Sequence, residues 1–226
     1  VTTIDGQTTG QPSEAALLKV VGKSVLPKPE QRNIAQTSSW QARAVGVQFA
    51  SLALSPSELV MIERFDDNGI AWNRFDVLAL KTSLTPNRIV LATLPVCGAR
   101  QLDPFLQQLG VEQKGSMVGG YVPFNYMDAQ VRVDYFKMMD KLIAQGFDGV
   151  MLDGLWLNNV FGSEENAKAF VSEIVNYCRV IKSLSQFHIV LRGCEHWTDL
   201  SLFPFVSGIV KKNLFYIGYM PQIATV

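Results

Sequence analysis

Residues 146–154 read Gly146-Phe147-Asp148-Gly149-Val150-Met151-Leu152-Asp153-Gly154, a short apolar run that ends in a carboxylate. The run Val150–Leu152 does not alternate apolar with polar residues, so it predicts a strand buried on both faces. A stripe of apolar residues at helical spacing, Val131–Ile143, precedes it, and Gly146 is a typical helix stop. A helix that leads into a buried strand is typical of a parallel sheet. Asp148 precedes the strand and is therefore expected at the opposite end from Asp153, at the helix-to-strand turn.

The alternation of apolar runs with helical stripes continues over the rest of the chain. Two further stripes, Leu102–Leu109 and Ala167–Ile181, predict helices, and Ser163 is placed to cap the second. The six runs that predict strands are Val45–Ala50, Leu59–Ile62, Ile89–Leu94, Val150–Leu152, Ile189–Leu191 and Phe205–Val210. The predicted fold is α/β, a TIM-type (β/α) barrel of parallel strands. A closed barrel has eight strands and about 250 residues. Either the N-terminal residues and the stretch Leu214–Met220 supply the missing strands, or the barrel is incomplete.

The composition of the chain changes near residue 40. Residues 1–39 are rich in Thr, Gln, Ser, Pro and Gly, which predicts an N-terminal arm or linker. Residues 40–226 then form the barrel domain, and the total of 226 residues fits one such domain.

Charge and composition exclude several classes of partner. Lys and Arg total 20, as do Asp and Glu, and this zero net charge argues against nucleic-acid binding and charge-driven membrane binding. No apolar run reaches the roughly 18 residues of a membrane-spanning helix. The cysteines and histidines lack the spacing of a zinc site, and no glycine-rich phosphate loop joins a strand to a helix. We therefore expect no metal, no cofactor, no nucleic-acid partner and no membrane span.

Carboxylates follow three of the predicted strands, at the edge where a parallel barrel forms its ligand site. Glu63, Asp153 and Glu195 come after the second, fourth and fifth runs, respectively. The alternative role of Asp153 is to cap a loop, and that of Glu63 is a salt bridge to Arg64 or Arg100. Two carboxylates that face one sugar are the minimum for acid/base hydrolysis of a glycoside. These three residues are therefore the candidate catalytic residues.

Aromatic and polar side chains near the same strand ends are candidates for substrate binding. Aromatic faces stack on sugar rings, although packing of loops on the barrel rim explains such residues equally well. The candidate substrate-binding residues are Gln48, Tyr126, Trp156, Arg192, Trp197 and Lys212.

Four pieces of the chain, in a fixed order, carry a family resemblance. They are Val47-Gln48-Phe49, the stretch Gly146–Asp153, the helix through Phe170 and Arg179 with Phe187–Val190, and Ser207–Val210 with Asn213–Tyr216. The second of them is similar to the family motif Gly-Phe-Asp-Gly-Val-Tyr-Leu-Asp. From about Trp40 to Tyr216 the chain resembles glycoside hydrolase family 114, the endo-α-1,4-polygalactosaminidase-like barrels. The resemblance implies a polysaccharide hydrolase in which Asp153 acts with a second carboxylate.

The chain departs from that family at three strand ends. Cys97-Gly98-Ala99 stands where the family has Gly-Glu-Ala, so Gly98 replaces a glutamate. Glu63 replaces an aspartate, and Lys212 stands where the second catalytic glutamate is expected. Lysine cannot act as the carboxylate partner in a two-carboxylate mechanism. Of the pair that the resemblance implies, only Asp153 is therefore retained.

Two functions follow from this pattern. The first is a glycosidase that hydrolyses a polysaccharide resembling galactosaminogalactan, with Asp153 as acid/base or nucleophile and Glu195 or Glu63 as its partner. The alternative is a catalytically degenerate barrel, a pseudo-enzyme that binds a glycan or a protein without cleaving it. The loss of two acids favours a neutral or acetylated sugar. A polysaccharide or oligosaccharide partner and a Thr/Gln/Pro-rich arm together predict a secreted or periplasmic protein.

Overall fold

The computed structural model describes residues 34–43, 48–66, 68–85, 87–197, 201–211, 214–217 and 220–223. Their main sheet has eight strands in the order β1-β2-β3-β6-β7-β8-β9-β10. The strands are β1 (Trp40–Arg43), β2 (Leu59–Ile62), β3 (Ile89–Pro95), β6 (Gly149–Asp153), β7 (His188–Arg192), β8 (Gly208–Lys211), β9 (Leu214–Ile217) and β10 (Met220–Ile223). Neighbours from β1 to β8 pair in parallel, whereas β9 and β10 pair antiparallel.

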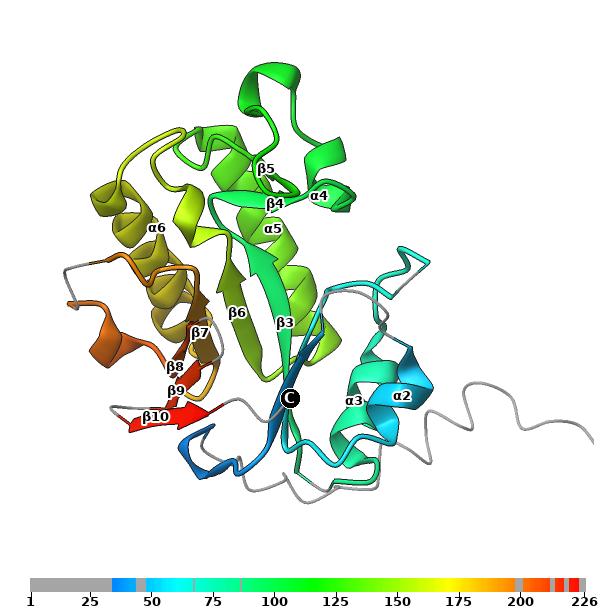
Figure 1. The fold of residues 1–226 in the computed structure, drawn as a ribbon. Coiled ribbons are helices and arrows are strands. Elements are labelled where there is room, and N and C mark those ends of the chain that lie inside the picture. The colour runs from blue at the N-terminus through cyan, green and yellow to red at the C-terminus, as the bar shows by residue number, and fades with distance from the viewer. Residues whose placement is uncertain are drawn as a thin grey trace, which may run out of the picture. The chain divides into compact units, whose positions relative to one another are not determined.

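The six parallel strands form a curled half-barrel with helices between them (Figure 1). The predicted α/β barrel of the TIM type is therefore confirmed in its incomplete form. The stretch that begins at Leu214 does extend the sheet, but it runs antiparallel and so does not supply a further barrel strand.

Short sequence signals set where the helices begin and end. The helices are α2 (Phe49–Ala53), α3 (Arg74–Thr82), α4 (Pro104–Gln107), α5 (Ala129–Gln145) and α6 (Glu164–Asn176), and a π-helical turn (Tyr177–Ile181) follows α6. Asp128 caps α5 by accepting from two backbone N–H groups, and Gly146 ends that helix with a left-handed backbone. Ser163 caps α6 as predicted. Asp103 and Pro104 start α4, so this helix is shorter than its apolar stripe suggested.

The first predicted strand is wrong. The strand of the sheet is Trp40–Arg43, and the end of the run Val45–Ala50 begins helix α2 instead. Phe49 is exposed and Leu52 is the buried residue of that helix, so the last two residues of the run belong to a surface helix and not to a core strand. Residues 45–47 of the run lie outside the described residues. Trp40, in contrast, packs against the apolar residues inside the curl of the sheet.

The two faces of the sheet carry separate apolar clusters. The inner cluster includes Leu59, Met61, Leu91, Met151 and Val190. The residues that alternate with them face the helices and join a larger cluster, which includes Val60, Ile62, Val90, Leu152 and Leu191. Side chains alternate between faces along a strand, so the next inner positions at the carboxyl ends are Glu63, Thr93, Asp153 and Arg192.

A two-stranded antiparallel sheet lies beyond the carboxyl end of β3. It pairs β4 (Gly98–Arg100) with β5 (Tyr121–Pro123), and the 3₁₀ turn Val111–Gln113 lies between them along the chain. Figure 1 shows this sheet beside the upper ends of β3 and β6. It carries Arg100 and Tyr121 to the same edge as Asp153.

No helix in the described ranges is long and apolar enough to cross a membrane. Within the same ranges, no group of three or more His, Cys, Asp or Glu residues is arranged to hold a metal ion. The predicted arm lies mostly outside the described residues, which begin at Ile34, and Ile34 itself is buried in the inner cluster.

Candidate active site

Asp153 is held at the end of β6 by donors on both of its carboxylate oxygens. It is 5% exposed. The hydroxyl of Tyr121 donates to Oδ2 at 2.9 Å, and the backbone N–H of Gly154 donates to Oδ1 at 2.8 Å. A guanidinium nitrogen of Arg192 lies 3.6 Å from Oδ2. These contacts fix the orientation of the carboxylate, as a catalytic or ligand-binding group requires.

The glycine that follows Asp153 is required by the backbone. Gly154 has φ of +77°, and a Cβ there would lie 2.3 Å from the carbonyl oxygen of Gly98. A Cβ at Gly98 would in turn lie 2.3 Å from a methyl group of Leu157 and 3.3 Å from the backbone of Pro123. Gly98, which replaces the glutamate of the resembled family, therefore sits in a tight contact between β4 and the end of β6.

Tyr121 is a hydrogen-bond donor at neutral pH. Burial, the charge of Asp153 and the hydrogen bond to it raise the pKa of the Tyr121 hydroxyl to about 12. The guanidinium of Arg100 lies over its ring at 5.4 Å from the centroid. The ring of Trp156 meets it edge to face at 5.7 Å. Tyr121 thus links the carboxylate to the aromatic rim of the site.

Glu63 is a second carboxyl group on the inner face, at the end of β2. It is 6% exposed, and burial raises its pKa to about 7, with smaller upward contributions from the charges of Asp103 and Asp153. The cations of Arg64 and Arg100 act in the opposite direction. Glu63 therefore stays mostly protonated below about pH 7 and is about half protonated at that pH. A buried carboxylic acid of this kind is suited to general acid catalysis.

The ion pairs around Glu63 decide between its two predicted salt-bridge partners. Nε of Arg100 lies 3.6 Å from the Glu63 carboxylate, and Arg64 forms its ion pair with Asp103 instead. The candidate site thus contains two acids, Glu63 and Asp153, and two partly exposed arginines, Arg100 and Arg192.

Trp156, a candidate substrate-binding residue, also lies at this rim. It belongs to the 3₁₀ turn Leu155–Leu157 and is 38% exposed. A Cβ at Gly119 or Gly193 would lie 3.4 Å or 2.9 Å from its indole ring, so both glycines leave room for it. An indole ring that is partly exposed beside Asp153 and Tyr121 is a platform on which a sugar ring can stack.

Tyr126 and Trp197, predicted as substrate-binding residues, pack in the helix-side cluster. Tyr126 is fully buried, and its hydroxyl donates to the carbonyl oxygens of Asn158 and Ser163 at 2.9 Å and 3.2 Å. Its ring stacks on that of Phe170, with 6.2 Å between the ring centroids. Trp197 is also buried, with the ammonium of Lys168 over its ring at 5.6 Å. These contacts match the packing role that was the alternative for the aromatic candidates.

The remaining predicted residues are not joined to Asp153 by a described contact. Glu195 is exposed beyond the end of β7, and within the described ranges no hydrogen bond or ion pair connects it with Asp153. Gln48 is exposed and precedes α2 instead of following a strand. Lys212 lies outside the described residues. Their roles stay predictions.

Sequence reasoning did not include Tyr121, Arg100 and Thr93 among the site residues. Tyr121 and Arg100 reach the site through pairing of β4 with β5, and their separation along the chain hides this contact. Thr93 lies on the inner face of β3, and its buried hydroxyl has no hydrogen-bond partner in the described part of the chain. The available signal for Thr93 was that it is a polar residue inside an apolar run.

The sequence has relatives among curated proteins. No family model matches it. An uncharacterized protein of Methanocaldococcus jannaschii is 36% identical over an alignment of 95 residues, and the match covers 37% of this chain and 27% of that protein. An uncharacterized protein of Deinococcus radiodurans is 25% identical over 171 residues, 68% of this chain and 51% of that protein. The chain therefore spans about half or less of the length of these relatives.

Solved glycoside hydrolase structures share the fold. The glycoside hydrolase domain of PelA from Pseudomonas aeruginosa has a TM-score of 0.54 and 16% identity, covering 76% of this chain and 66% of that chain. Ega3 from Aspergillus fumigatus, in complex with galactosamine, has a TM-score of 0.53 and 14% identity, covering 77% of this chain and 73% of that chain. The half-barrel thus has the fold of glycoside hydrolase domains.

Proposed function

We propose that this chain is a glycoside hydrolase that cleaves a polysaccharide at the carboxyl ends of its parallel strands. The proposal rests on one observation: Glu63 and Asp153 occupy inner-face strand ends, and burial raises the pKa of Glu63 to about 7 while donors hold the Asp153 carboxylate. Acid/base hydrolysis of a glycoside needs one carboxyl group that donates a proton and a second that acts as nucleophile or base.

The roles follow from the surroundings of each group. Glu63 donates a proton to the leaving oxygen, because its raised pKa keeps the carboxyl protonated near neutral pH. Asp153 serves as the nucleophile or the base that activates water. Tyr121 and Arg192 orient the Asp153 carboxylate, and Trp156 supports the sugar ring. Glu63 thereby takes the place of the second acid that the family resemblance puts at Lys212.

The charge of the site favours a neutral or acetylated sugar polymer. A cationic amino sugar would meet Arg100 and Arg192, which stand beside the two acids. The relation to Ega3, solved with galactosamine, makes a galactosaminogalactan-like polymer the natural reference substrate. We propose that its acetylated form is cleaved faster than its deacetylated form, because acetylation removes the positive charge.

The test is release of reducing ends from both forms of that polymer and from a neutral galactan. Asp153→Asn is the inactivated variant, and Glu173→Gln is the matched control, since Glu173 pairs with Arg132 on the exposed side of α6. We expect the wild type and the control to cleave at equal rates and Asp153→Asn to lose activity. Equal cleavage rates for all three proteins would show that Asp153 has no role in catalysis.

A second candidate, a glycan-binding protein without hydrolase activity, is favoured by two departures from the resembled family. Gly98 and Lys212 stand where two glutamates are expected. The binding function predicts saturable retention of a glycan with no release of reducing ends, and loss of retention in Trp156→Ala. Cleavage by the wild type that depends on Asp153 decides for the hydrolase.

We propose a location outside the cytoplasm for the natural gene product, secreted or periplasmic, because its substrate is a polysaccharide. Fractionation of cells that carry a tagged full-length gene product tests this location. Recovery in the cytosolic fraction alone would contradict it.

A further inference from the structure

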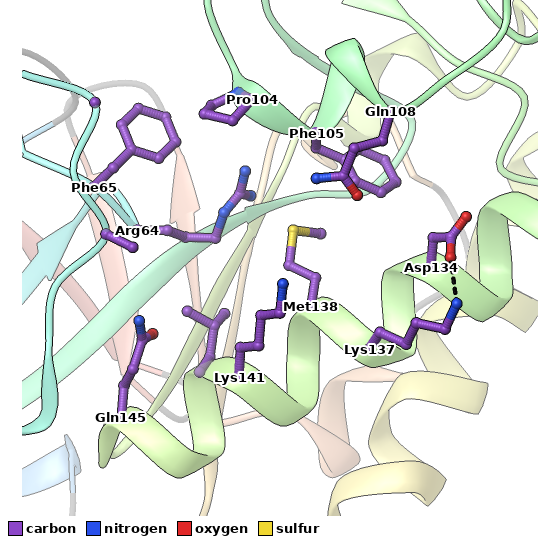
Figure 2. Close-up of a pocket in the computed structure, with 13 residues that line it drawn as sticks. Arg64, Phe65, Pro104, Phe105, Gln108, Asp134, Lys137, Met138, Lys141 and Gln145 are labelled. Atoms are coloured by element: carbon purple, nitrogen blue, oxygen red, sulfur yellow. Dashed lines mark hydrogen bonds and ion pairs between the residues drawn. The ribbon is translucent and has the colours of Figure 1, made fainter.

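A cavity of about 270 Å³ lies on the helix side of the sheet, behind Glu63. Arg64 follows Glu63 in the sequence and lines this cavity. The side chains of Glu63 and Arg64 therefore lie on opposite faces of the sheet. The loop after β2, helix α4 and helix α5 line it, and it opens to solvent (Figure 2). Its apolar wall includes Phe65, Phe105 and Met138. The volume is just under the roughly 300–1,000 Å³ of sites for drug-sized ligands, so the occupant is a small molecule.

Arg64 brings an incompletely paired cation to this cavity. The residue is 6% exposed, and one guanidinium nitrogen, Nη2, pairs with Asp103. The other, Nη1, is buried and has no hydrogen-bond partner in the described part of the chain. Figure 2 shows the guanidinium directed into the space between Pro104 and Met138. A buried N–H group without a partner is unfavourable, and an anion in the cavity would satisfy it.

Lys141 supplies a second cation from α5. Figure 2 shows its side chain reaching toward the same space, beside Met138. No ion pair involving Lys141 is found over the described ranges, whereas Lys137 on the same helix pairs with Asp134 at 2.8 Å. Asp103 balances Arg64 and Asp134 balances Lys137, which leaves the charge of Lys141 unbalanced among these groups. One excess positive charge matches a ligand with one negative charge.

We propose that this cavity binds a small organic monoanion. Its carboxylate accepts hydrogen bonds from Nη1 of Arg64 and from the ammonium of Lys141, a charge-assisted arrangement. Its apolar body packs against Phe65, Phe105 and Met138. Since the cavity and the candidate active site lie on opposite faces of the sheet, the ligand does not compete with the polysaccharide.

The test is calorimetric titration of the whole chain at low salt with benzoate, a flat monoanion, and with benzamide, its neutral counterpart. We expect saturable one-to-one binding of benzoate that weakens as salt increases. We expect benzamide to bind about tenfold more weakly or not at all, since it lacks the charge-assisted hydrogen bonds. No saturable binding of benzoate, or equal binding of both compounds, would overturn the proposal.

Two variants locate the bound anion. Lys141→Gln should weaken benzoate binding about tenfold, the size of one charge-assisted hydrogen bond. Met138→Trp should abolish binding by filling the cavity. Lys182→Gln is the control, because Lys182 pairs with Asp140 away from the cavity lining. If Met138→Trp fails to keep the wild-type circular dichroism, Lys141→Gln decides alone. Benzoate binding that Lys141→Gln leaves unchanged would overturn the proposal.

Discussion

The two carboxylates that flank strand β6 have contacts of different kinds. Asp148, at the amino end, accepts a hydrogen bond from the backbone N–H of Val90 at 2.9 Å and pairs with Lys81 at 2.7 Å. Asp153, at the carboxyl end, contacts Tyr121 and Arg192, side chains from two other strands. The amino-end carboxylate ties the sheet to a helix, whereas the carboxyl-end carboxylate is held by side chains of the candidate active site.

The contacts of Lys81 strengthen this contrast. Its ammonium also donates to the carbonyl oxygen of Gly146, which ends α5. Asp148 and Lys81 thereby join α3, the end of α5 and the start of β3 and β6. In a parallel barrel the carboxyl ends of the strands carry chemistry and the amino ends carry stability. The proposed function assigns the two ends of β6 the same division of roles.

The largest effect that we expect separates the two ends by activity. Asp153→Asn removes the ionisable group with little change in shape, so glycan cleavage should fall by about 10²–10⁴-fold or more, the scale of acid/base catalysis. Asp148→Asn should cleave at the wild-type rate. Initial rates of reducing-end release measure both variants. A loss of activity of the same size in Asp148→Asn would contradict the different roles that we assign to Asp148 and Asp153.

The second effect separates the two ends by stability. Asp148→Ala removes the hydrogen bond to Val90 and the pair with Lys81, and we expect the free energy of unfolding to fall by about 1–3 kcal/mol. Urea denaturation followed by circular dichroism measures the change. If Asp148→Ala unfolds at the same urea concentration as the wild type, the amino-end carboxylate does not tie the sheet as described.

The third effect is a pH dependence of stability caused by Glu63. Its pKa is raised in the folded state from 4.5 to about 7, so the folded protein binds the proton more tightly than the unfolded chain. The contribution of Glu63 to stability is therefore present below pH 4.5 and is lost as pH rises to about 7.

Unfolding experiments at pH 5 and pH 8 on the wild type and Glu63→Gln isolate this contribution. The wild type should lose about 1–3 kcal/mol more than the variant between the two values, as expected for a shift of this direction. An identical pH dependence in both proteins would mean that Glu63 does not titrate near neutral pH.

The smallest effect concerns the two aromatic groups, Trp156 at the rim and Tyr126 in the core. Trp156→Ala should raise KM about two- to tenfold through loss of ring stacking, with little change in stability. Tyr126→Phe should leave KM unchanged and lower the free energy of unfolding by about 1 kcal/mol, since it removes the one hydroxyl proton that two backbone carbonyl oxygens share. Steady-state kinetics and thermal melts distinguish the two. A raised KM in Tyr126→Phe with an unchanged KM in Trp156→Ala would contradict the assignment of Trp156 to substrate binding and of Tyr126 to packing.

Local patterns predicted the fold better than they predicted the site. The Gly146–Asp153 stretch and the helix before it were predicted correctly. The signals for a buried strand and for a helix end come from residues that are close together in the sequence. The strand Trp40–Arg43 was missed, because its amphipathic sequence gave a weaker signal than the apolar run beside it. Burial of that run could not be judged from its composition alone.

The site depended on contacts between distant residues. Asp153, Glu63, Arg192 and Trp156 were selected because each lies at or just after the end of a predicted strand, and the rule of carboxyl-end sites applies to sequence order. Tyr121 was not selected, because its contact with Asp153 needs the β4–β5 pairing over a separation of 32 residues. The raised pKa of Glu63 was equally hidden, since burial is a property of the folded chain.

The central claim is that Glu63 donates the proton to the leaving oxygen while Asp153 acts as nucleophile or base, and the pH dependence of kcat/KM tests it most directly. With the polymer that the wild type cleaves fastest, the account predicts that kcat/KM falls as pH rises through about 7, where Glu63 loses its proton. In Glu63→Gln this decline should disappear and the remaining rate should be low at every pH. A decline near pH 7 that persists unchanged in Glu63→Gln would contradict the account.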